Sequence, residues 1–543
     1  MSIETRQAWY EGITRYQWLV LAIACLGWIF DVFEGQIFVA SMNEAMPSLF
    51  PEAVKAFTPE VQEGYKQFYI LVTFGAFLVG GALGGVIFGM MSDRIGRKKA
   101  MTYTILMYSV FTFVSALSVA WWHMAVTRFL VAMGVGGEWA VASALVAEVF
   151  PKRARAKVLS IFHASSILGT YLAIAAGQFV VNNPAFESET YPSLSWRFGF
   201  LVGVLPALLI IWVRMSLKEP PSWEQAKTSA MQDVSQKMGS FSGLFASDVR
   251  RNTLVGVSLA SIGMATFWGV HVFGKDLVRN EVERGYFGNQ PDPSKAAEVE
   301  KAYDEAVRDY KTQHAGEAIS ETLEATLQEV RGKLGSVGLL GVRTELPPGG
   351  LTREGTPNSS NPFQQLDPPQ VEVIKQLLTA TKKPFKQRIK SWEMLAMFLT
   401  STGGGLGLLA FGPVSDRIGR RRTFVFYHVG GLVVALITLR LPMEITWMLA
   451  VLPVFGFLTL GMHAGYAVYF PELFPTRLRG TGGGFCFNFG RFVAAPILFL
   501  AGWMQKDWGF NLRDTASLLS LLYLLGVVVI WFAIETRDEE LPD

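Results

Sequence analysis

Twelve apolar segments, each about long enough to cross a lipid bilayer, run through this 543-residue sequence and constrain its fold more than any other feature. A hydrocarbon core of about 30 Å takes roughly 20 residues of apolar helix to cross. Charged residues make up only 17% of the chain, against about a quarter in soluble domains. The sequence therefore predicts an all-α polytopic membrane protein and excludes a single water-soluble globular domain. The segments lie at approximately 17–42, 68–91, 101–120, 122–147, 157–181, 197–216, 253–274, 392–413, 423–441, 445–469, 481–503 and 514–534.

Basic residues gather in four short loops, which join segments 2 and 3, 4 and 5, 8 and 9, and 10 and 11. All four loops fall on one side of the membrane, and the positive-inside rule makes that side cytoplasmic. Both ends of the chain are then cytoplasmic, and the expected location is a bacterial cytoplasmic (inner) membrane. Asp31 and Glu34 lie inside the first segment, which argues against reading that segment as a signal peptide.

Two polar regions divide the chain into expected domains. Residues 217–252 are predicted to be a cytoplasmic linker between an N-terminal six-helix bundle (1–216) and a C-terminal one (253–543). Residues 275–390, between segments 7 and 8, form a long insertion that we expect to face outward. Within it, 296–313 and 319–334 are predicted helices that are charged all round, and 347–369 is a predicted loop. The basic stretch 382–390 opposes this topology, but long loops translocate largely regardless of their charge.

Two stretches of sequence occur once in each half. Residues 89–99, Gly-Met-Met-Ser-Asp-Arg-Ile-Gly-Arg-Lys-Lys, recur at 412–422 as Gly-Pro-Val-Ser-Asp-Arg-Ile-Gly-Arg-Arg-Arg. Residues 148–155, Glu-Val-Phe-Pro-Lys-Arg-Ala-Arg, recur at 472–479 as Glu-Leu-Phe-Pro-Thr-Arg-Leu-Arg. Whole blocks of helices are thus repeated in the same orientation. Such a repeat predicts two bundles related by a pseudo-two-fold axis along the membrane normal, with a cavity between them.

The repeated 89–99 and 412–422 stretches resemble the signature loop of the major facilitator superfamily, and 128–139 resembles its helix-4 motif. Three further features, Asp31-x-x-Glu34, 218–223 and 482–491, are most similar to the sialic-acid:proton symporter family and related carboxylate:proton symporters. Aromatic-acid:proton symporters share parts of the first and third. The resemblance implies a secondary transporter that couples proton movement to uptake of a small organic anion, such as sialic acid, by alternating access.

Ionisable side chains within the apolar segments are costly, which makes the few that occur candidate functional groups. Asp31 and Glu34 share one helical face, and close carboxylates in a low dielectric disfavour double ionisation, which suits one of them to carry a proton. Arg128 is the expected partner, and the alternative is that it simply neutralises a carboxylate. Depth in the membrane favours Glu34 as this partner, whereas resemblance to proton-coupled sugar porters favours Asp31, so both stay open. Glu138 is either a second proton site or a cap for a polar neighbour.

Arg491 and Asn488, three residues apart in segment 11, are the expected substrate-binding pair. A guanidinium fork matches a carboxylate, and an amide matches hydroxyl or carbonyl groups, so we expect an organic anion as ligand. The alternative for Arg491 is a buried ion pair with a carboxylate of another helix. Further candidate substrate-binding residues are Trp139, Trp268, Tyr466 and His163, which can equally well be packing or structural hydrogen-bonding groups.

The repeated loops are expected to form a charge network that closes the cytoplasmic side and breaks on opening. The alternative is that their charges only set the topology. The residues concerned are Gly89, Asp93, Arg94, Gly96, Arg97, Glu148 and Arg155 in the first half, and Gly412, Asp416, Arg417, Gly419, Arg420, Glu472 and Arg479 in the second.

Several function classes find no support in the sequence. There is no Gly-x-x-x-x-Gly-Lys-[Ser/Thr] motif for ATP, and the two cysteines, Cys25 and Cys486, offer neither a disulfide framework nor a zinc spacing. The net charge of +3 gives no argument for nucleic acid binding. We expect no enzyme activity, metal or cofactor, and a monomer with protons, a small organic anion and lipid as partners. Alternative functions are an aromatic-acid or sugar symporter, an exporter, or a transporter-like receptor that uses the insertion.

Overall fold

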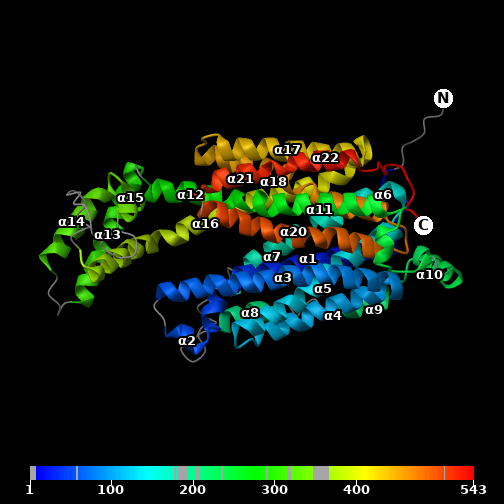
Figure 1. Ribbon diagram of the computed structural model, residues 1–543, viewed down its shortest axis with the longest axis horizontal. Helices are drawn as coiled ribbons and strands as arrows, with labels where there is room; N and C mark the ends of the chain where they lie inside the picture. The colour runs from blue at the N-terminus through cyan, green and yellow to red at the C-terminus, as the bar shows by residue number, and fades with distance from the viewer. Residues whose placement is uncertain are drawn as a thin grey trace. The chain divides into compact units, whose positions relative to one another are not determined.

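The computed structural model describes residues 8–56, 59–176, 179–180, 194–202, 207–233, 236–288, 291–314, 320–345, 366–506 and 508–543. Throughout these ranges the regular secondary structure is helical, with no strand (Figure 1). The helices are α1 Arg15–Ser48, α2 Glu52–Lys55, α3 Pro59–Ile95, α4 Arg97–Ala116, α5 Trp121–Val149, α6 Lys152–Ala164, α7 Ser166–Ala176, α8 Leu194–Val202, α9 Ala207–Ser216, α10 Pro221–Gln232, η4 Ser242–Phe245, α11 Arg250–Gly269, η5 His271–Phe273, α12 Gly274–Phe287, α13 Pro293–Gln313, α14 Glu321–Leu334, α15 Gly338–Glu345, α16 Pro368–Ile418, α17 Arg420–Arg440, α18 Ile445–Leu460, α19 His463–Leu473, α20 Arg479–Lys506, α21 Leu512–Ser520 and α22 Leu522–Trp531. The prediction of an all-α protein is confirmed.

Nine helical stretches of the described chain are long and apolar enough to cross a membrane. They match the predicted segments 1, 2, 4, 5, 7, 8, 9, 10 and 12. The other three predicted segments correspond to α4, to α8 with α9, and to α20. Helix α20 carries Asn488 and Arg491 among its apolar residues, and residues 203–206, between α8 and α9, lie outside the described residues. The count of twelve spans therefore stays a prediction.

The chain forms two compact units. Unit 1 comprises residues 1–273, 400–441 and 453–543, and so contains helices of both predicted bundles. Unit 2 comprises 274–399 and 442–452, a range that contains the whole of the predicted insertion, 275–390. The predicted linker and bundle boundaries stay predictions, as does the outward orientation of the insertion.

Unit 2 has a hydrophobic core of its own. The two helices predicted in the insertion are present as α13 and α14. The expectation that they are charged all round is wrong, because each buries one apolar face: Val299 and Tyr303 on α13, and Leu327 and Val330 on α14, are at most 3% exposed. These apolar residues recur at helical spacing between charged ones, so the sequence of each helix did contain a narrow apolar stripe. The predicted loop at 347–369 lies largely outside the described residues.

Close helix packing in unit 1 brings the two halves of the chain together. The long helices of this unit lie side by side (Figure 1), and α3 of the first half packs along α20 of the second. Glycines make this approach possible: a side chain at Gly89 would put a Cβ 2.5 Å from the carbonyl oxygen of Gly480. A side chain at Gly412 would meet the carbonyl oxygen of Ala156 at the same distance. Small residues commonly permit such contacts between helices in membranes.

Candidate functional site

Glu34 on α1 and Arg128 on α5 form a buried ion pair. An Nη1–Oε2 distance of 3.6 Å separates them, and both side chains are fully buried. Arg128 also donates to the main-chain carbonyl of Glu34 at 2.7 Å, and Thr112 on α4 donates to the Glu34 carboxylate at 2.6 Å. Of the two carboxylates that sequence reasoning left open, Glu34 is therefore the one that the structure pairs with Arg128.

Asp31 lies one helical turn away in a different setting. The side chain is 1% exposed, and neither carboxyl oxygen has a hydrogen-bond partner among the described residues. Its charge interacts with those of Glu138, Glu34 and Arg491, the last of which belongs to the other half of the chain. An ionised carboxylate held without hydrogen bonds in an apolar interior costs far more free energy than a protonated one.

Glu138 on α5 contacts both α4 and α1. One carboxyl oxygen accepts a short hydrogen bond from Thr104, and the other has no partner within the described ranges. A Cβ at Gly27 would lie 2.7 Å from that second oxygen, so the glycine on α1 leaves the room that Glu138 occupies. The bond to Thr104 fits the structural alternative, whereas the free oxygen fits a proton site.

Phe487 on α20 gathers most of the predicted substrate-binding residues around one ring. Trp139 stacks on it with centroids 3.8 Å apart, and the Arg491 guanidinium lies 5.2 Å from its centroid. His163 and Tyr466 each lie 6.3 Å away, centroid to centroid. These residues come from α5, α6, α19 and α20, so the cluster joins the two halves. Sequence reasoning missed Phe487, although it lies in the same stretch as Asn488 and Arg491.

The polar atoms of this cluster are largely committed to partners within the protein. Trp139 donates its indole N–H to Nδ1 of His163 at 3.2 Å, which makes that nitrogen an acceptor and the imidazole neutral. The Tyr466 hydroxyl donates to the carbonyl of Leu259 at 3.0 Å. Trp268 is packed edge-on against the ring of Phe74 at 5.6 Å.

Asn488 and Arg491 retain free capacity. The Asn488 amide nitrogen donates to the carbonyls of Gly136 and Gly484, while its oxygen has no partner in the described part of the chain. No carboxylate of the described residues lies within 4 Å of the Arg491 guanidinium, although its charge interacts with that of Asp31. The buried ion pair that was the alternative for Arg491 is thus a longer-range attraction rather than a contact.

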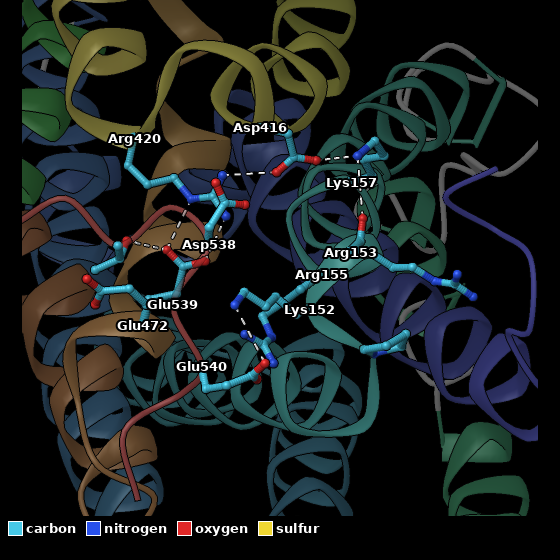
Figure 2. Close-up of a pocket in the computed structure, with 12 residues that line it drawn as sticks. Lys152, Arg153, Arg155, Lys157, Asp416, Arg420, Glu472, Asp538, Glu539 and Glu540 are labelled. Atoms are coloured by element: carbon cyan, nitrogen blue, oxygen red, sulfur yellow. Dashed lines mark hydrogen bonds and ion pairs between the residues drawn. The ribbon is translucent and has the colours of Figure 1, made fainter. Parts of the chain in front are cut away.

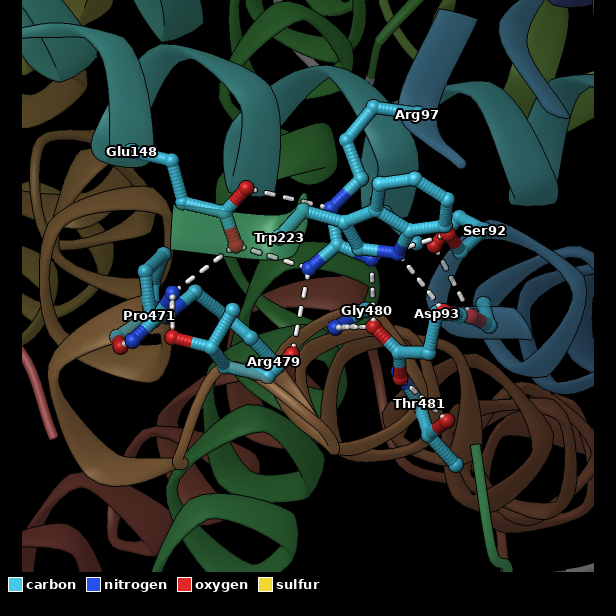
Figure 3. A network of polar contacts seen from close by, with 12 residues as sticks. Ser92, Asp93, Arg97, Glu148, Trp223, Pro471, Arg479, Gly480 and Thr481 are labelled. Atoms are coloured by element: carbon cyan, nitrogen blue, oxygen red, sulfur yellow. Dashed lines mark hydrogen bonds and ion pairs between the residues drawn. The ribbon is translucent and has the colours of Figure 1, made fainter. Parts of the chain in front are cut away.

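A charge network of the first half centres on Arg97 (Figure 3). The guanidinium contacts Asp93 at 2.7 Å and both carboxyl oxygens of Glu148, at 3.1 and 2.7 Å. Glu148 in turn binds Arg479 of the second half at 2.8 Å. Asp93 accepts hydrogen bonds from the main-chain N–H groups of Gly480 and Thr481, at the start of α20. The network therefore ties the two halves together at this end of unit 1.

The second half repeats this arrangement. Arg420 contacts Asp416 at 3.0 Å and both oxygens of Glu472, at 3.1 and 2.9 Å. Asp416 also forms a short ion pair with Lys157 of the first half. Lys157 lies nine residues after Glu148, as Thr481 lies nine residues after Glu472, so the contacts between the halves follow the internal repeat.

The remaining predicted network residues lie at the edges of these two arrangements. Arg94 donates to the carbonyl of Gly239 at 3.0 Å, and Arg155 to that of Ala147 at 3.1 Å. The carbonyl of Arg417 accepts from Arg537 at 2.8 Å.

Two glutamates that sequence reasoning missed cap α4 and α17. Gly96 and Gly419, with φ of +107° and +93°, precede these helices in a conformation that favours glycine. Glu219 accepts from the N–H groups of Arg97 and Lys98, and Glu535 accepts from those of Arg420 and Arg421. Each glutamate follows the last apolar segment of its half, a regularity that the sequence did contain.

Partial burial raises the pKa of the Glu219 carboxyl, and the hydrogen bonds from the main-chain N–H groups of Arg97 and Lys98 oppose that rise. The carboxylate is therefore held by the start of α4, where the helix dipole favours a negative charge.

A charged pocket of about 680 Å³ opens at the same end of unit 1 (Figure 2). The segment after α22 crosses it: Thr536 donates to Glu472 at 2.6 Å, Glu540 pairs with Lys152 at 3.6 Å, and the carbonyl of Pro542 accepts from Arg479 at 2.7 Å. The pocket is lined by Pro151, Lys152, Arg153, Arg155, Lys157, Asp416, Arg420, Glu472, Thr536, Asp538, Glu539 and Glu540.

Membrane-spanning helices, buried charges between two halves and a repeated network at one end define a membrane transporter. Comparison with known proteins identifies its family. The chain belongs to the sugar (and other) transporter family of the major facilitator superfamily, whose family model matches residues 40–262 and 389–542. The superfamily predicted from the repeated loops is thereby confirmed. The family match omits residues 263–388, which include most of the predicted insertion.

Similar proteins of known name are transporters. The sialic acid transporter NanX of Escherichia coli (strain K12) is 31% identical over 220 residues, which cover 40% of this chain and 48% of that protein. The cis,cis-muconate transport protein of Acinetobacter baylyi is 22% identical over 85% of each chain. Among solved structures, the proton:xylose symporter XylE matches with a TM-score of 0.58 and 14% identity, over 97% of this chain and 98% of its own. This structural likeness establishes the fold.

Proposed function

We propose that this protein carries a small organic anion together with a proton, by alternating access of the two halves of unit 1. The observation that carries this proposal is Asp31, a fully buried carboxyl group without a hydrogen-bond partner among the described residues. Its charge interacts with that of Arg491 across the boundary between the halves. A carboxyl group so placed can exchange a proton when the protein opens to water.

Proton and substrate binding are coupled because Asp31 and the substrate carboxylate both interact with Arg491. While Asp31 is ionised, it attracts the guanidinium and competes with an anionic substrate. Once Asp31 binds a proton, Arg491 is free to receive a substrate carboxylate through its forked donors. One proton and one monocarboxylate then move together, and the transported complex carries no net charge. The Glu34–Arg128 pair, with matched charges already in contact, is assigned a positioning role in this scheme.

The repeated charge network is proposed as the gate. Arg97, Glu148 and Arg479 are all fully buried, so separating the halves at this end must break a buried ion pair and rehydrate its charges. The 536–542 segment adds bonds to Glu472 and Arg479 at the same end. These contacts favour the state in which this end is closed, and a bound substrate must supply the difference for opening.

Carboxylic acids are the proposed substrate class. Arg491 supplies the anion site, and its guanidinium lies over the ring of Phe487, which stacks on Trp139. The names of two relatives, a sialic acid transporter and a muconate transport protein, agree with this class. Sialic acid is one candidate, and an aromatic or unsaturated acid such as muconate is the second.

Purified protein in liposomes tests the proposal. We expect labelled sialic acid, benzoate or muconate to accumulate when an inward pH gradient is imposed. For a monocarboxylate, a potassium diffusion potential without a pH gradient should drive little uptake, because the proton and anion charges cancel. Accumulation of a neutral sugar but of none of these acids would contradict the role of Arg491. Absence of any flux would favour a receptor instead.

A further inference from the structure

His463 stands at a break in one of the membrane-spanning stretches. The apolar stretch Ile445–Leu473 is divided into α18, which ends at Leu460, and α19, which begins at His463. A helix broken within the membrane leaves main-chain groups without helical partners and is often found beside a transporter's binding site.

The internal repeat places His463 opposite a predicted substrate-binding residue. His463 lies nine residues before Glu472, and Trp139 lies nine residues before Glu148, the repeat equivalent of Glu472. The two side chains therefore occupy matching positions in the two halves. Trp139 donates its only polar hydrogen to His163, whereas His463 has a ring nitrogen without a hydrogen-bond partner among the described residues.

One nitrogen of His463 has no hydrogen-bond partner among the described residues. The side chain is 4% exposed; its ring interacts with the main-chain carbonyl of Gly263, and Nε2 has no hydrogen-bond partner in the described chain. In the tautomer that carries its proton on Nδ1, which lets the ring donate to that carbonyl, Nε2 is a hydrogen-bond acceptor. A buried acceptor left unsatisfied is destabilising, and a ligand that donates to it relieves that penalty.

His463 belongs to the aromatic cluster that carries Arg491. Its ring lies 5.3 Å from that of Tyr466 and 5.5 Å from that of Phe267. Tyr466 in turn packs against Phe487, over which Arg491 is placed. The rings of Tyr466 and Phe487 thus lie between the unpartnered Nε2 of His463 and the guanidinium of Arg491 in a continuous series of contacts.

We propose that His463 is a substrate-binding residue whose Nε2 accepts a hydrogen bond from a hydroxyl or N–H group of the transported acid. The inference rests on the proposed function, in which Arg491 holds the carboxylate. It narrows the substrate class to acids that carry a hydrogen-bond donor away from the carboxylate. A site with a fixed acceptor discriminates against an analogue that lacks the donor, because the acceptor then stays unpaired.

Paired acids that differ by one hydroxyl test this assignment in liposomes. The pairs are 4-hydroxybenzoate with benzoate, and lactate with propionate. We expect the wild-type protein to take up the hydroxylated member of at least one pair with a KM about five- to tenfold lower, the size of one neutral hydrogen bond. His463→Phe should remove this preference while leaving the KM of the other member unchanged. His463→Gln, which keeps an acceptor, should retain part of it.

His428→Gln is the matched control, because His428 is also buried with an unpartnered Nε2 among the described residues but lies on α17 against Gly526 of α22. Its preference for the hydroxylated acid should equal that of the wild type. His463→Leu serves as a second acceptor-free variant if the phenylalanine variant does not fold.

Two outcomes overturn the assignment of His463. One is an unchanged preference in a folded His463→Phe or His463→Leu protein, and the other is a wild type that transports the acids without regard to the hydroxyl. Both leave the proposed function intact. A wild-type protein that transports no acid at all contradicts the proposed function itself.

Discussion

Asp31 and Glu34 are three residues apart on one helix, yet their surroundings differ in kind. Glu34 has a counter-ion at 3.6 Å and a hydrogen bond from Thr112. Asp31 has neither in the described part of the chain and interacts with Arg491 only at longer range. A carboxylate with fixed partners is held in one charge state, whereas a buried one without them is stable when protonated and ionises when water reaches it. This contrast is the reason why we propose Asp31 rather than Glu34 as the proton carrier.

We therefore expect Asp31→Asn and Glu34→Gln to behave differently. Asp31→Asn should lower uptake driven by a pH gradient at least tenfold while keeping exchange of labelled for unlabelled substrate, since the carrier can still move without a proton. Glu34→Gln should keep gradient-driven uptake but lower thermal stability, because Arg128 loses its buried counter-ion. Proteoliposome uptake and counterflow, with thermal unfolding in detergent, measure both effects.

Asp248→Asn, at an exposed carboxylate paired with Arg477, is the control for the charge change and should leave uptake unchanged. Gradient-driven uptake that survives in Asp31→Asn but fails in Glu34→Gln would reverse the assignment.

Arg491 provides a second prediction at this scale. Arg491→Lys keeps the positive charge but loses the planar fork of donors, so we expect the KM for a carboxylate substrate to rise about tenfold or more with a smaller change in maximal rate. Arg440→Lys, at an exposed pair with Asp514, should leave the KM unchanged. An equal fall in maximal rate at constant KM would indicate that Arg491 acts in the conformational change rather than in binding.

The two helices that start within the repeated loops, α4 and α17, have N-termini that are built alike. Each follows a glycine with positive φ and has its first N–H groups bound by a distant glutamate, Glu219 or Glu535. A residue that caps free N–H groups typically contributes about 1 kcal/mol. Through these bonds, Glu219 and Glu535 each connect the segment that follows the last helix of their half to a helix of the proposed gate.

Removal of either cap should lower stability without affecting substrate binding. We expect Glu219→Ala and Glu535→Ala each to reduce the free energy of unfolding by about 1 kcal/mol, measured as a lower thermal midpoint with unchanged KM. Glu224→Ala, on the exposed face of α10, should leave the midpoint unchanged. If the three variants are equally stable, the caps contribute nothing.

The gate gives a prediction at the level of helix contacts. In Glu148→Gln, Arg97 and Arg479 keep a hydrogen-bond partner but lose a shared buried anion, so the contact between α5 and α20 should weaken. A cysteine at Ser160, close to Gly412 of the other half, reports this opening when Cys25 and Cys486 are replaced by alanine. We expect maleimide labelling of that cysteine to speed up severalfold.

Glu540→Gln is the matched control for the gate. Its ion pair with Lys152 is exposed, and exposed ion pairs contribute only about 0–1 kcal/mol to stability. The maleimide labelling rate of the cysteine at position 160 should therefore change little. Equal labelling rates in Glu148→Gln and the wild type would show that the network does not hold the halves closed.

For the whole molecule, the fold divides into a transport unit and a second helical unit with its own core. The family match covers the chain on both sides of residues 263–388 and omits them. Because α13 and α14 bury apolar faces within unit 2, the insertion is a folded element rather than an extended loop. The positive-inside rule predicts that it faces outward.

Cysteine labelling in intact cells tests this topology. In a protein with Cys25 and Cys486 replaced by alanine, Lys301→Cys on exposed α13 should react with a membrane-impermeant maleimide added outside. Lys99→Cys, exposed in the first repeated loop, should react only after permeabilisation. The reverse pattern would invert the predicted orientation.

Much of the fold was present in the sequence because membrane insertion depends on local properties. A run of about 20 apolar residues predicts a helix wherever it stands, and the repeated loops revealed the internal duplication. The sequence also predicted a charge network, because charges at fixed spacing beside helix ends in both halves indicate a shared contact. Its members include Asp93, Arg97 and Glu148 and their equivalents in the second half.

Only the tertiary structure decided which interior groups meet. Whether Arg128 contacts Glu34 or Asp31, and whether Phe487 lies beneath Arg491, depends on the rotation of each helix about its axis and its distance from its neighbours. Those quantities arise from packing between residues hundreds of positions apart, and hydropathy does not encode them. The apolar segments could therefore be predicted from the sequence, whereas the surroundings of Asp31 and His463 were set by how the helices pack.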